Sequence, residues 1–350
     1  MSITIDDIAK QCGLSRATVS RVLRNSPNVS KKSRRLVEKV IRDTGYQPNQ
    51  MAQSLAQGYS NTVALIVGNI SSIAQIEITK VIQKGLFEQS LMAWLCNSDY
   101  DSALCDEYLD MAVASKLAGA FLITTSPTTK KLKQVVDNGL PVVMVNRRAD
   151  AVLCDSIIVN DQKSAYQAVN FLMDRGHKNI VLLSVSQDLI AGHNAYLGFK
   201  DAIEERGLGF SDRLVYEIDI YAYSDTLKPR HPFDAAQLFQ EHPDTTAVIS
   251  LSYEVLIDFY YQCQSLGKHI PRDLSLVCLD PIQTERIPGL TLTTFGADQR
   301  TLGEVAVKQM LSRIQARKDA AQSYSSNIVL EPLQTEGTSV CRLKHGTDEI

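Results

Sequence analysis

Between residues 62 and 317, short apolar runs alternate with longer amphipathic stretches, and this order most limits the folds open to the chain. The apolar runs are four to six residues long, the length of a buried strand, and occupy 62–67, 92–96, 119–123, 142–145, 180–183, 247–250 and 276–279. The stretches with helical spacing occupy 77–90, 103–116, 162–175, 195–206, 254–266 and 298–317. Such alternation predicts doubly wound parallel sheets, in which ligands bind beyond the carboxyl ends of the strands.

The length and the cysteine content restrict the class of protein. A chain of 350 residues predicts two or three domains, each with its own core. The seven cysteines are odd in number and form no C-x-x-C pair, which argues against a disulfide framework or a zinc cluster. No run is long and apolar enough to cross a bilayer, and the first residues lack a secretion-signal pattern. We therefore expect a cytoplasmic protein with no membrane partner, no metal and no cofactor.

The net charge of −3 hides a strong asymmetry along the chain. Residues 1–60 contain ten Lys or Arg and four Asp or Glu, a balance of +6, so the other 290 residues carry −9. A basic head on an acidic body indicates a polyanionic partner for the head. A basic run can also be a solvated face, so charge alone is weak support.

The head begins with two short predicted helices joined by a glycine turn. Thr4 and Ser15 are good N-caps, and Gly13 can adopt the positive φ that ends the first helix. Val19 and Val22 supply the buried stripe of the second helix, which leaves its polar and Arg side chains on other faces. This is a helix-turn-helix arrangement, whose second helix fits the major groove of DNA.

A third helix is predicted from Ser30 to Gly45, and its first turn is crowded with cations. Positive charge at a helix N-terminus opposes the helix dipole, so the crowding favours a phosphate-binding role. The alternative is a three-helix core with solvated charges. Residues 48–58 then run from a proline suited to a helix start to a glycine stop, a length too short for a stable free helix. We predict that they fold on DNA, with Leu55 as a minor-groove wedge or, alternatively, as a core contact.

These residues resemble the LacI/GalR family of bacterial repressors. The matching pieces of the head are TIDDIA at 4–9, GLS at 13–15, TVSRVL at 18–23, VS at 29–30 and GYQPN at 45–49, followed by Ala52 and Leu55. The resemblance implies that paired hinge helices insert a leucine at the centre of an operator. The predicted DNA-contacting residues are Thr4, Ser15, Arg16, Ala17, Thr18, Ser20, Arg21, Arg24, Asn28, Ser30, Ser33, Asn49, Ala52 and Leu55.

The resemblance continues through the body to about residue 342. It includes VALIV at 63–67, LAGAFLI at 117–123, PVVMVNR at 141–147, RGHKNI at 175–180 and IPRDLSLV at 270–277. It implies a periplasmic-binding-protein-like body of two α/β lobes joined by three chain crossings. The expected divisions are a head at 1–47, a hinge and linker at 48–61, lobe one at 62–160 and 293–325, lobe two at 161–292 and 326–342, and a polar tail at 343–350.

A cleft between the lobes is where the resemblance implies a small-molecule effector. The residues that it places there are Gln75, Thr125, Asn146, Asn194, Tyr253 and Asp280. Ala195 stands where the family has an Arg that binds a sugar, purine or acid by forked hydrogen bonds. The effector is therefore unusual, or another group such as His193, Asn194 or Arg147 replaces the Arg, or the body responds to no small molecule. Asp280 fits a pocket residue and a turn residue equally well.

The chain shows no pattern of an enzyme. No P-loop, G-x-S-x-G elbow or H-E-x-x-H pair occurs, and the six histidines lack metal spacing. We expect a repressor, active as a homodimer because the tail is short and polar and lacks a tetramerising helix. The competing interpretations are a solute-binding protein or an enzyme on the same two-lobed fold, and a DNA-binding regulator without an effector.

Overall fold

The structure is a computed structural model that describes residues 3–23, 28–46, 58–219, 233–282, 287–318 and 325–343. The chain divides into two compact units, residues 1–61 and residues 62–350. Within the described ranges, no helix combines the length and the apolar character needed to cross a membrane.

The first unit is a three-helix head, and each of its helices begins where the sequence predicts. The helices are α1 (Ile5–Cys12), α2 (Arg16–Leu23) and α3 (Lys31–Thr44). Thr4 and Asp7 form a capping box at α1, and the hydroxyl oxygens of Ser15 and Ser30 accept backbone N–H bonds in the first turns of α2 and α3. Gly13 ends α1 with a φ of 61°.

A small core holds the three helices together. Ile8 from α1, Val19 from α2 and Val37 from α3 have no exposed surface. Ala9, Cys12 and Val22 complete the buried cluster. The apolar residues sit at helical spacing, so packing one stripe of each helix buries the core and leaves the charged faces outside. The helix-turn-helix prediction is confirmed.

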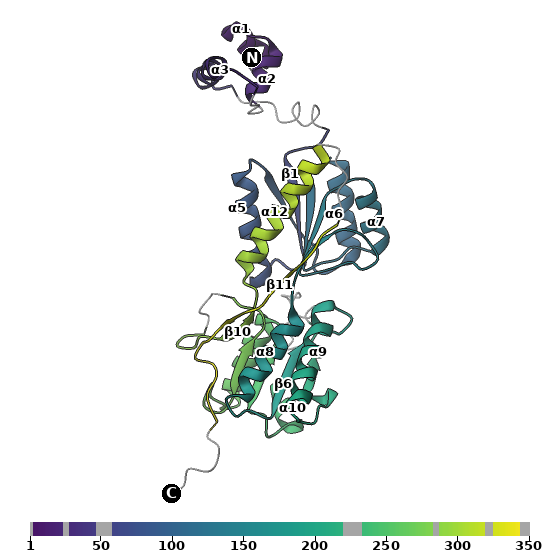
Figure 1. Cartoon of the computed structure of the whole chain (residues 1–350), viewed down its shortest axis with the longest axis vertical. Coiled ribbons are helices and arrows are strands. Elements are labelled where there is room, and N and C mark those ends of the chain that lie inside the picture. The colour runs from purple at the N-terminus through teal and green to yellow at the C-terminus, as the bar shows by residue number, and fades with distance from the viewer. Residues whose placement is uncertain are drawn as a thin grey trace. The chain divides into compact units, whose positions relative to one another are not determined.

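The second unit contains two six-stranded sheets, and the first sheet forms lobe one (Figure 1). Its strands are β1 (Thr62–Val67), β2 (Met92–Asn97), β3 (Gly119–Ile123), β4 (Val142–Val145), β5 (Asp155–Val159) and β11 (Asn327–Leu330). They run parallel in the order β11-β5-β4-β3-β1-β2. Its flanking helices are α5 (Ile73–Glu88), α12 (Gln299–Lys318), α6 (Ser102–Ala114) and α7 (Thr129–Asp137). Helix α5 packs on α12 and α6 packs on α7, as two separate layers (Figure 1).

The second sheet forms lobe two. Its strands are β6 (Ile180–Ser184), β7 (Val215–Glu217), β8 (Ala247–Ser250), β9 (Ser275–Cys278), β10 (Thr293–Gly296) and β12 (Leu333–Thr335). The order is β12-β10-β9-β8-β6-β7, and β12 alone among these pairs antiparallel to its neighbour. One face is covered by α8 (Asp161–Met173) and α9 (Ile190–Glu205), the other by α10 (Ala235–Glu241) and α11 (Tyr253–Ser265). The predicted α/β architecture is confirmed.

The chain crosses between the lobes three times, and two of the predicted lobe boundaries need correction. The crossings follow β5, β10 and β11. Residues 293–296 were expected in lobe one, but they pair with β9 as part of the second sheet. Residues 327–330 were expected in lobe two, but they pair with β5, with Ile328 opposite Ile157. Both strands are only four residues long, and their membership depends on distant partners rather than on local pattern.

Close packing fixes the elements that line the space between the lobes. Helices α8 and α9 touch at Gly198, where a Cβ atom would lie 1.9 Å from the backbone oxygen of Gln162. Helix α12 is held to β5 by the Arg313 guanidinium, which donates to both carboxylate oxygens of the buried Asp155. The first turn of α8 is therefore held firmly beside the crossing that follows β5, and the C-terminal part of α12 is fixed to the start of β5.

Candidate DNA-reading helix and effector cavity

Helix α2 presents a polar surface opposite its buried stripe. Arg16, Ala17 and Arg21 are exposed, while Val19 and Val22 are buried in the core of the head. Arg16 makes one long ion pair with Asp6, at 3.5 Å, and both side chains remain more than half exposed. Exposed Arg side chains beside a small Ala are suited to reading base edges in the major groove.

The predicted hydroxyl contacts are also the caps of the helices. The hydroxyl oxygens of Thr4, Ser15 and Ser30 accept from backbone N–H groups of the turns that follow them. The hydroxyl of Ser30 donates to that of Ser33 at 2.9 Å. These hydroxyls therefore stand at exposed helix starts, the position from which backbone N–H groups bind phosphate oxygens.

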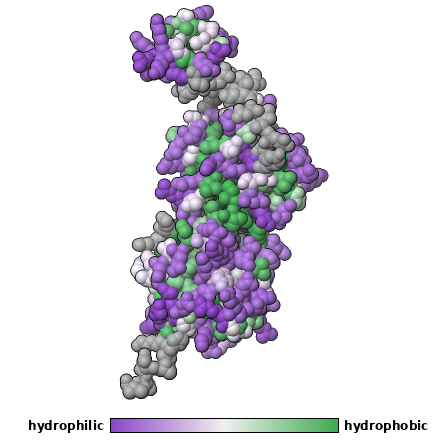
Figure 2. Space-filling view, viewed as in Figure 1, coloured by the Kyte–Doolittle hydropathy of each residue, from purple (hydrophilic) through white to green (hydrophobic). Residues whose placement is uncertain are grey.

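The first turn of α3 contains cations and no acid. Lys31, Lys32 and Arg35 are exposed, and Asn28 is exposed just before the cap. Figure 2 shows that the visible face of the head is largely hydrophilic. The head thus combines an exposed basic helix start with an exposed Arg-bearing helix. Thr18 and Ser20 are half-buried on α2, and four further predicted contacts, Arg24, Asn49, Ala52 and Leu55, lie outside the described residues.

A cavity of about 540 Å³ lies between the two lobes of the body. Its walls come from the carboxyl ends of parallel strands and from the helix starts that follow them, in both lobes. Lobe one contributes residues such as Gln75, Asn146 and Arg147, and lobe two contributes residues such as Tyr253 and Asp280. The sequence predicted a ligand site at these strand ends, and a volume of this size accommodates a small metabolite.

The lobe-one wall is organised by a chain of hydrogen bonds. The Gln75 carbonyl oxygen accepts from the backbone N–H of Asn69 at 2.9 Å, and its amide nitrogen donates to the Tyr100 hydroxyl at 2.8 Å. The Tyr100 ring packs directly against the backbone of Gly68. A Cβ atom at that position would lie 2.4 Å from Tyr100 Cε1, so only glycine fits there. Gln75 is therefore held in one orientation by two partners and is only 3 % exposed.

Two polar contacts join the lobes across the cavity. A Glu254 carboxylate oxygen, on α11, accepts from the Ser72 hydroxyl at 2.8 Å and from the backbone N–H of Ile73 at 3.0 Å, both at the start of α5. The Gln299 amide nitrogen, at the start of α12, donates to Asp280, which follows β9. A carboxylate at a helix N-terminus is favoured by the helix dipole, so Glu254 stabilises this contact between the lobes.

Two carboxyl groups of the cavity titrate far from their ordinary range. Burial, followed by the nearby Glu254 and Asp161 carboxylates, raises the pKa of Asp280 to about 8. Burial also raises the pKa of Asp161 to about 7, against the opposing effect of Arg147. Carboxylates that share a confined space with too little positive charge hold their protons more tightly.

Two family models match the chain. The model of bacterial regulatory proteins of the lacI family matches residues 4–49, and a periplasmic binding protein-like domain matches residues 169–332. The chain therefore combines a lacI-family helix-turn-helix domain with a periplasmic binding protein-like domain. The first match covers the head with its α2 helix. The second covers most of lobe two, the two later crossings, and α12 and β11 of lobe one. Both domains are those that the resemblance to the LacI/GalR family predicted.

Individual relatives are similar to this chain over almost their whole length. The catabolite control protein A of Priestia megaterium is 27% identical over 309 residues, which are 88% of this chain and 91% of that protein. A lac repressor dimer bound to operator and the anti-inducer ONPF has a TM-score of 0.75 at 20% identity, covering 97% of this chain and all of that one. A transcriptional regulator CelR–cellobiose complex has a TM-score of 0.68 at 21% identity, covering 96% and 99%.

Four of the six predicted effector residues line the cavity. They are Gln75, Asn146, Tyr253 and Asp280. Thr125 lies behind the wall, where its hydroxyl is hydrogen-bonded to that of Ser98 at 2.8 Å, and the neighbouring Thr124 lines the cavity instead. Asn194 is half-buried on α9 and is not among the lining residues.

The position without the family Arg lies in a core. Ala195 has no exposed surface and packs among the buried residues of lobe two. Of the replacements considered from the sequence, Arg147 lines the cavity, whereas His193 is exposed on α9 and does not. Arg147 is 8 % exposed, and its guanidinium donates to the backbone oxygen of Asn146 at 3.1 Å.

Sequence reasoning missed Glu254, Asp161 and Gln299. Each stands within four residues of the end of a buried strand, as do four of the six residues that were predicted. The available signal was therefore an acid or amide in the first turn of the helix after such a strand. The family resemblance pointed to Tyr253 in this segment, so its neighbour Glu254 was not predicted.

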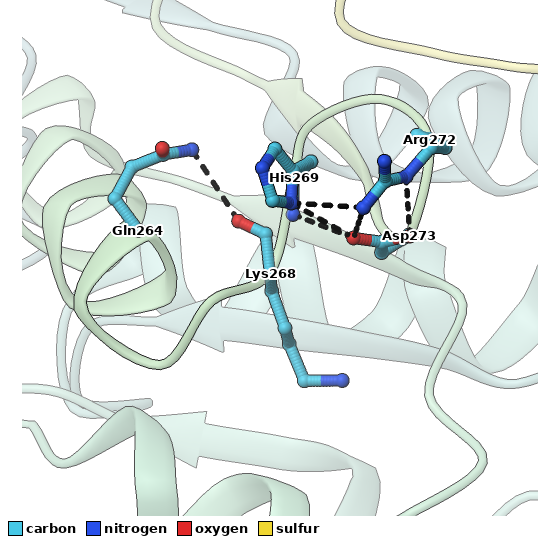
Figure 3. A network of polar contacts seen from close by, with 5 residues as sticks. All are labelled: Gln264, Lys268, His269, Arg272 and Asp273. Atoms are coloured by element: carbon cyan, nitrogen blue, oxygen red, sulfur yellow. Dashed lines mark hydrogen bonds and ion pairs between the residues drawn. The ribbon is translucent and has the colours of Figure 1, made fainter.

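A separate polar cluster in the loop before β9 has a structural role (Figure 3). Arg272 donates to both carboxylate oxygens of Asp273, from Nε at 2.9 Å and from Nη2 at 3.0 Å. The same Nη2 lies 3.0 Å from His269 Nδ1. Asp273 also accepts from the backbone N–H of His269, and the Arg272 guanidinium holds the pKa of this carboxyl well below its usual range. These groups bond within one exposed turn and do not line the cavity, so they fix the loop.

Another histidine secures the C-terminal segment. His177 has no exposed surface, and its ring nitrogens lie 3.0 Å from the Thr246 hydroxyl and 3.0 Å from the backbone oxygen of Cys341. Its burial lowers the pKa of the ring, which favours the neutral form. No group of three or more His, Cys, Asp or Glu among the described residues is arranged to hold a metal ion.

Proposed function

We propose that the protein is a sequence-specific transcriptional repressor whose operator affinity is modulated by a small metabolite in the cavity. The observation that carries the proposal is the surface of α2, where Arg16 and Arg21 are exposed while Val19 and Val22 anchor the helix. The match of residues 4–49 to the lacI-family model supports the same role. The DNA is double-stranded, because a helix of this kind reads base edges in the major groove.

The active form that we propose is a homodimer. Large apolar side chains are exposed on three successive elements of lobe one: Phe87 on α5, Met92 and Leu95 on β2, and Met111 on α6. Strand β2 is an edge strand of the first sheet, so these side chains lie along an open border. Two copies that joined there would present two heads to the two halves of a near-palindromic operator. The similar lac repressor is itself described as a dimer bound to operator.

The residues between head and body complete the DNA site in this proposal. Pairing of two hinge segments on the operator places Leu55 in a minor-groove base step, with Asn49 and Ala52 beside it. Such a wedge unstacks one step and bends the duplex, and the bend gives the protein more contact surface. This role rests on the sequence pattern, since residues 47–57 lie outside the described part of the chain.

Effector coupling follows from the contacts that cross the cavity. Glu254 bonds the start of α5, and Gln299 bonds Asp280, so a molecule that enters the cavity changes contacts made by both lobes. Ligands shift an equilibrium by their difference in affinity for its two states, and such coupling is typically about 1–3 kcal/mol. The body acts as a sensor and not as an enzyme, and the protein works in the cytoplasm, where its DNA is.

Mapping of the genomic DNA bound by the protein tests this function, combined with reporter measurements at the mapped sites. The expected result is a small set of sites that share a near-palindromic sequence, and reporter expression that rises when the gene for the protein is deleted. A variant carrying Arg16→Ala and Arg21→Ala should lose both the occupancy and the repression. Binding spread evenly over the genome, or reporters that ignore the deletion, would exclude a sequence-specific repressor.

A further inference from the structure

The charge of the cavity wall is strongly one-sided. Among the described residues that line the cavity, four carry carboxyl groups and one carries a cation. The acids are Asp161, Glu254, Asp258 and Asp280, from α8, α11 and the end of β9, and the cation is Arg147, from the end of β4. The sequence already lacks the family Arg at position 195. A cavity of this composition is poorly suited to anionic ligands.

Hydrogen-bond acceptors also exceed donors at the end of the cavity formed by Asp280. The Gln299 side chain is 6 % exposed, and its amide nitrogen is used by Asp280. Its carbonyl oxygen is buried and accepts no hydrogen bond from the described residues. An orphaned acceptor beside a carboxyl group is unfavourable unless a bound molecule supplies donors there.

The proton affinities of the acids agree with this shortage of positive charge. The raised pKa values of Asp280 and Asp161 mean that protons take the place of missing cations beside these carboxyl groups. A bound cation would stabilise the ionised carboxylates and release those protons. Arg147, Glu254 and Asp258 face the same space, and Tyr100, Tyr253 and Tyr261 add aromatic rings, which attract organic cations at their faces.

We propose that the effector is an organic cation, with a protonated amine, amidine or guanidine group that binds between Asp280, Asp161 and the Gln299 carbonyl oxygen. The rest of the molecule lies against the apolar part of the wall, which includes Ile73, Leu189 and Leu302. The proposal rests on the regulatory function proposed above and names the chemical class of its effector. It distinguishes this cavity from that of the relative solved with the neutral sugar cellobiose.

The test measures thermal stability of the full chain against probes that differ only in charge. One set is D-glucosamine, D-glucose and D-glucuronate, and the other is 5-aminopentanol, pentane-1,5-diol and 5-hydroxypentanoate. A ligand that binds only the folded protein raises its Tm, so the cation of at least one set should raise Tm more than its neutral and anionic partners. Larger shifts from the neutral or anionic members, or no shift from either cation, would overturn the inference.

Variants and calorimetry then test which carboxyl groups bind the cation. Asp280→Asn and Asp161→Asn should each weaken binding of the active cation by about 10- to 100-fold, since each removes a charged hydrogen bond. The matched control is Asp137→Asn, which removes an exposed carboxylate from α7, outside the cavity. At neutral pH the binding should release protons, seen as a binding enthalpy that depends on the buffer. Equal affinity in all variants, with no proton release, contradicts the proposed contacts.

Operator binding, measured on the same preparation, tests the proposed repressor function separately from the proposed class of effector. A neutral sugar that binds the cavity and changes operator affinity would leave the proposed repressor function intact and remove the cationic class. A protein that binds an amine in the cavity but prefers no DNA sequence would keep the cationic class of ligand and remove the proposed repressor function.

Discussion

The head and the body of this chain carry opposite net charges and place them differently. The head carries a formal charge of +6 over 60 residues and exposes its cations on α2 and at the start of α3. The body carries −9 and gathers four carboxyl groups around an internal cavity. The head thus presents its charge to a large external polyanion, whereas the body confines the opposite charge where only a small molecule can reach it.

The two units also differ in how much structure supports each site. The reading helix stands on a core of six buried residues, so its stability rests on few contacts. The cavity is built at the ends of two six-stranded sheets with helices on both faces. A small domain with few buried contacts is marginal, while a large one tolerates buried unpaired polar groups. The following changes test that difference.

The largest effect is expected from Ile8→Ala, which removes a fully buried side chain from the core of the head. Such substitutions cost about 2–5 kcal/mol, a large part of the stability of a small unit. Calorimetry should show the transition of the head shifted or lost while the transition of the body stays in place. The matched change Ile66→Ala in β1 should affect the body alone. A single transition that moves equally for both variants would contradict independent units.

The next effect concerns DNA reading and not folding. Arg21→Ala should weaken binding to the specific operator by about 1–3 kcal/mol, because a base-edge contact is lost, and should leave thermal stability unchanged. Lys39→Ala, an exposed cation of α3 outside the predicted contacts, is the control for loss of charge. Anisotropy titrations with operator and scrambled duplexes measure both. Equal losses of operator affinity for the two variants would mean that Arg21 contributes only general electrostatic attraction to DNA.

The body should show an unusual pH dependence that the head lacks. Asp280 has a pKa of about 8 in the folded body against an ordinary value of 3.8, so the folded state binds the extra proton between these values. Its stabilising contribution is therefore full in acid and is lost as the pH rises through about 8. The Tm of the body should fall by several degrees from about pH 6 to 9, and by less in Asp280→Asn. Equal slopes of Tm against pH for the two proteins would contradict the raised pKa of Asp280.

The smallest effect is expected from Asp6→Asn in the head. This change breaks the 3.5 Å ion pair with Arg16, whose partners are both exposed. Exposed pairs contribute about 0–1 kcal/mol, so the transition of the head should move little. Thermal melts in low and high salt provide the measurement. A loss as large as that of Ile8→Ala would mean that surface charge, and not the core, supports the head.

Local patterns predicted the parts of this protein that depend on neighbours in sequence. The caps at Thr4, Ser15 and Ser30 and the stops at Gly13 and Gly45 were all read from short stretches, and the structure has them. The alternation of strands and helices was read in the same way. Periodicity and capping are properties of a few adjacent residues, so no knowledge of the tertiary fold was needed.

Distant pairings and single-residue choices at strand ends could not be predicted in this way. The sheet that contains β10 or β11 is decided by partners far along the chain. Thr124 and not Thr125 lines the cavity, because the chain leaves the extended conformation directly after β3, where Thr124 has a φ of 54°. Glu254 acts across the cleft on Ser72, a contact between residues 182 positions apart. Such contacts follow from the arrangement of lobes and not from the local pattern.

The most direct test of the account is a selection of duplexes from a random library by the purified full chain, followed by titration of the selected duplex against a scrambled one. The account predicts an enriched near-palindromic sequence, bound at least about 10³-fold more tightly than the scrambled duplex at physiological salt. Substituting Arg16 and Arg21 together should remove most of that preference. A library that emerges without enrichment, bound with the same affinity as the scrambled duplex, would contradict a sequence-reading head and with it the role assigned to the body.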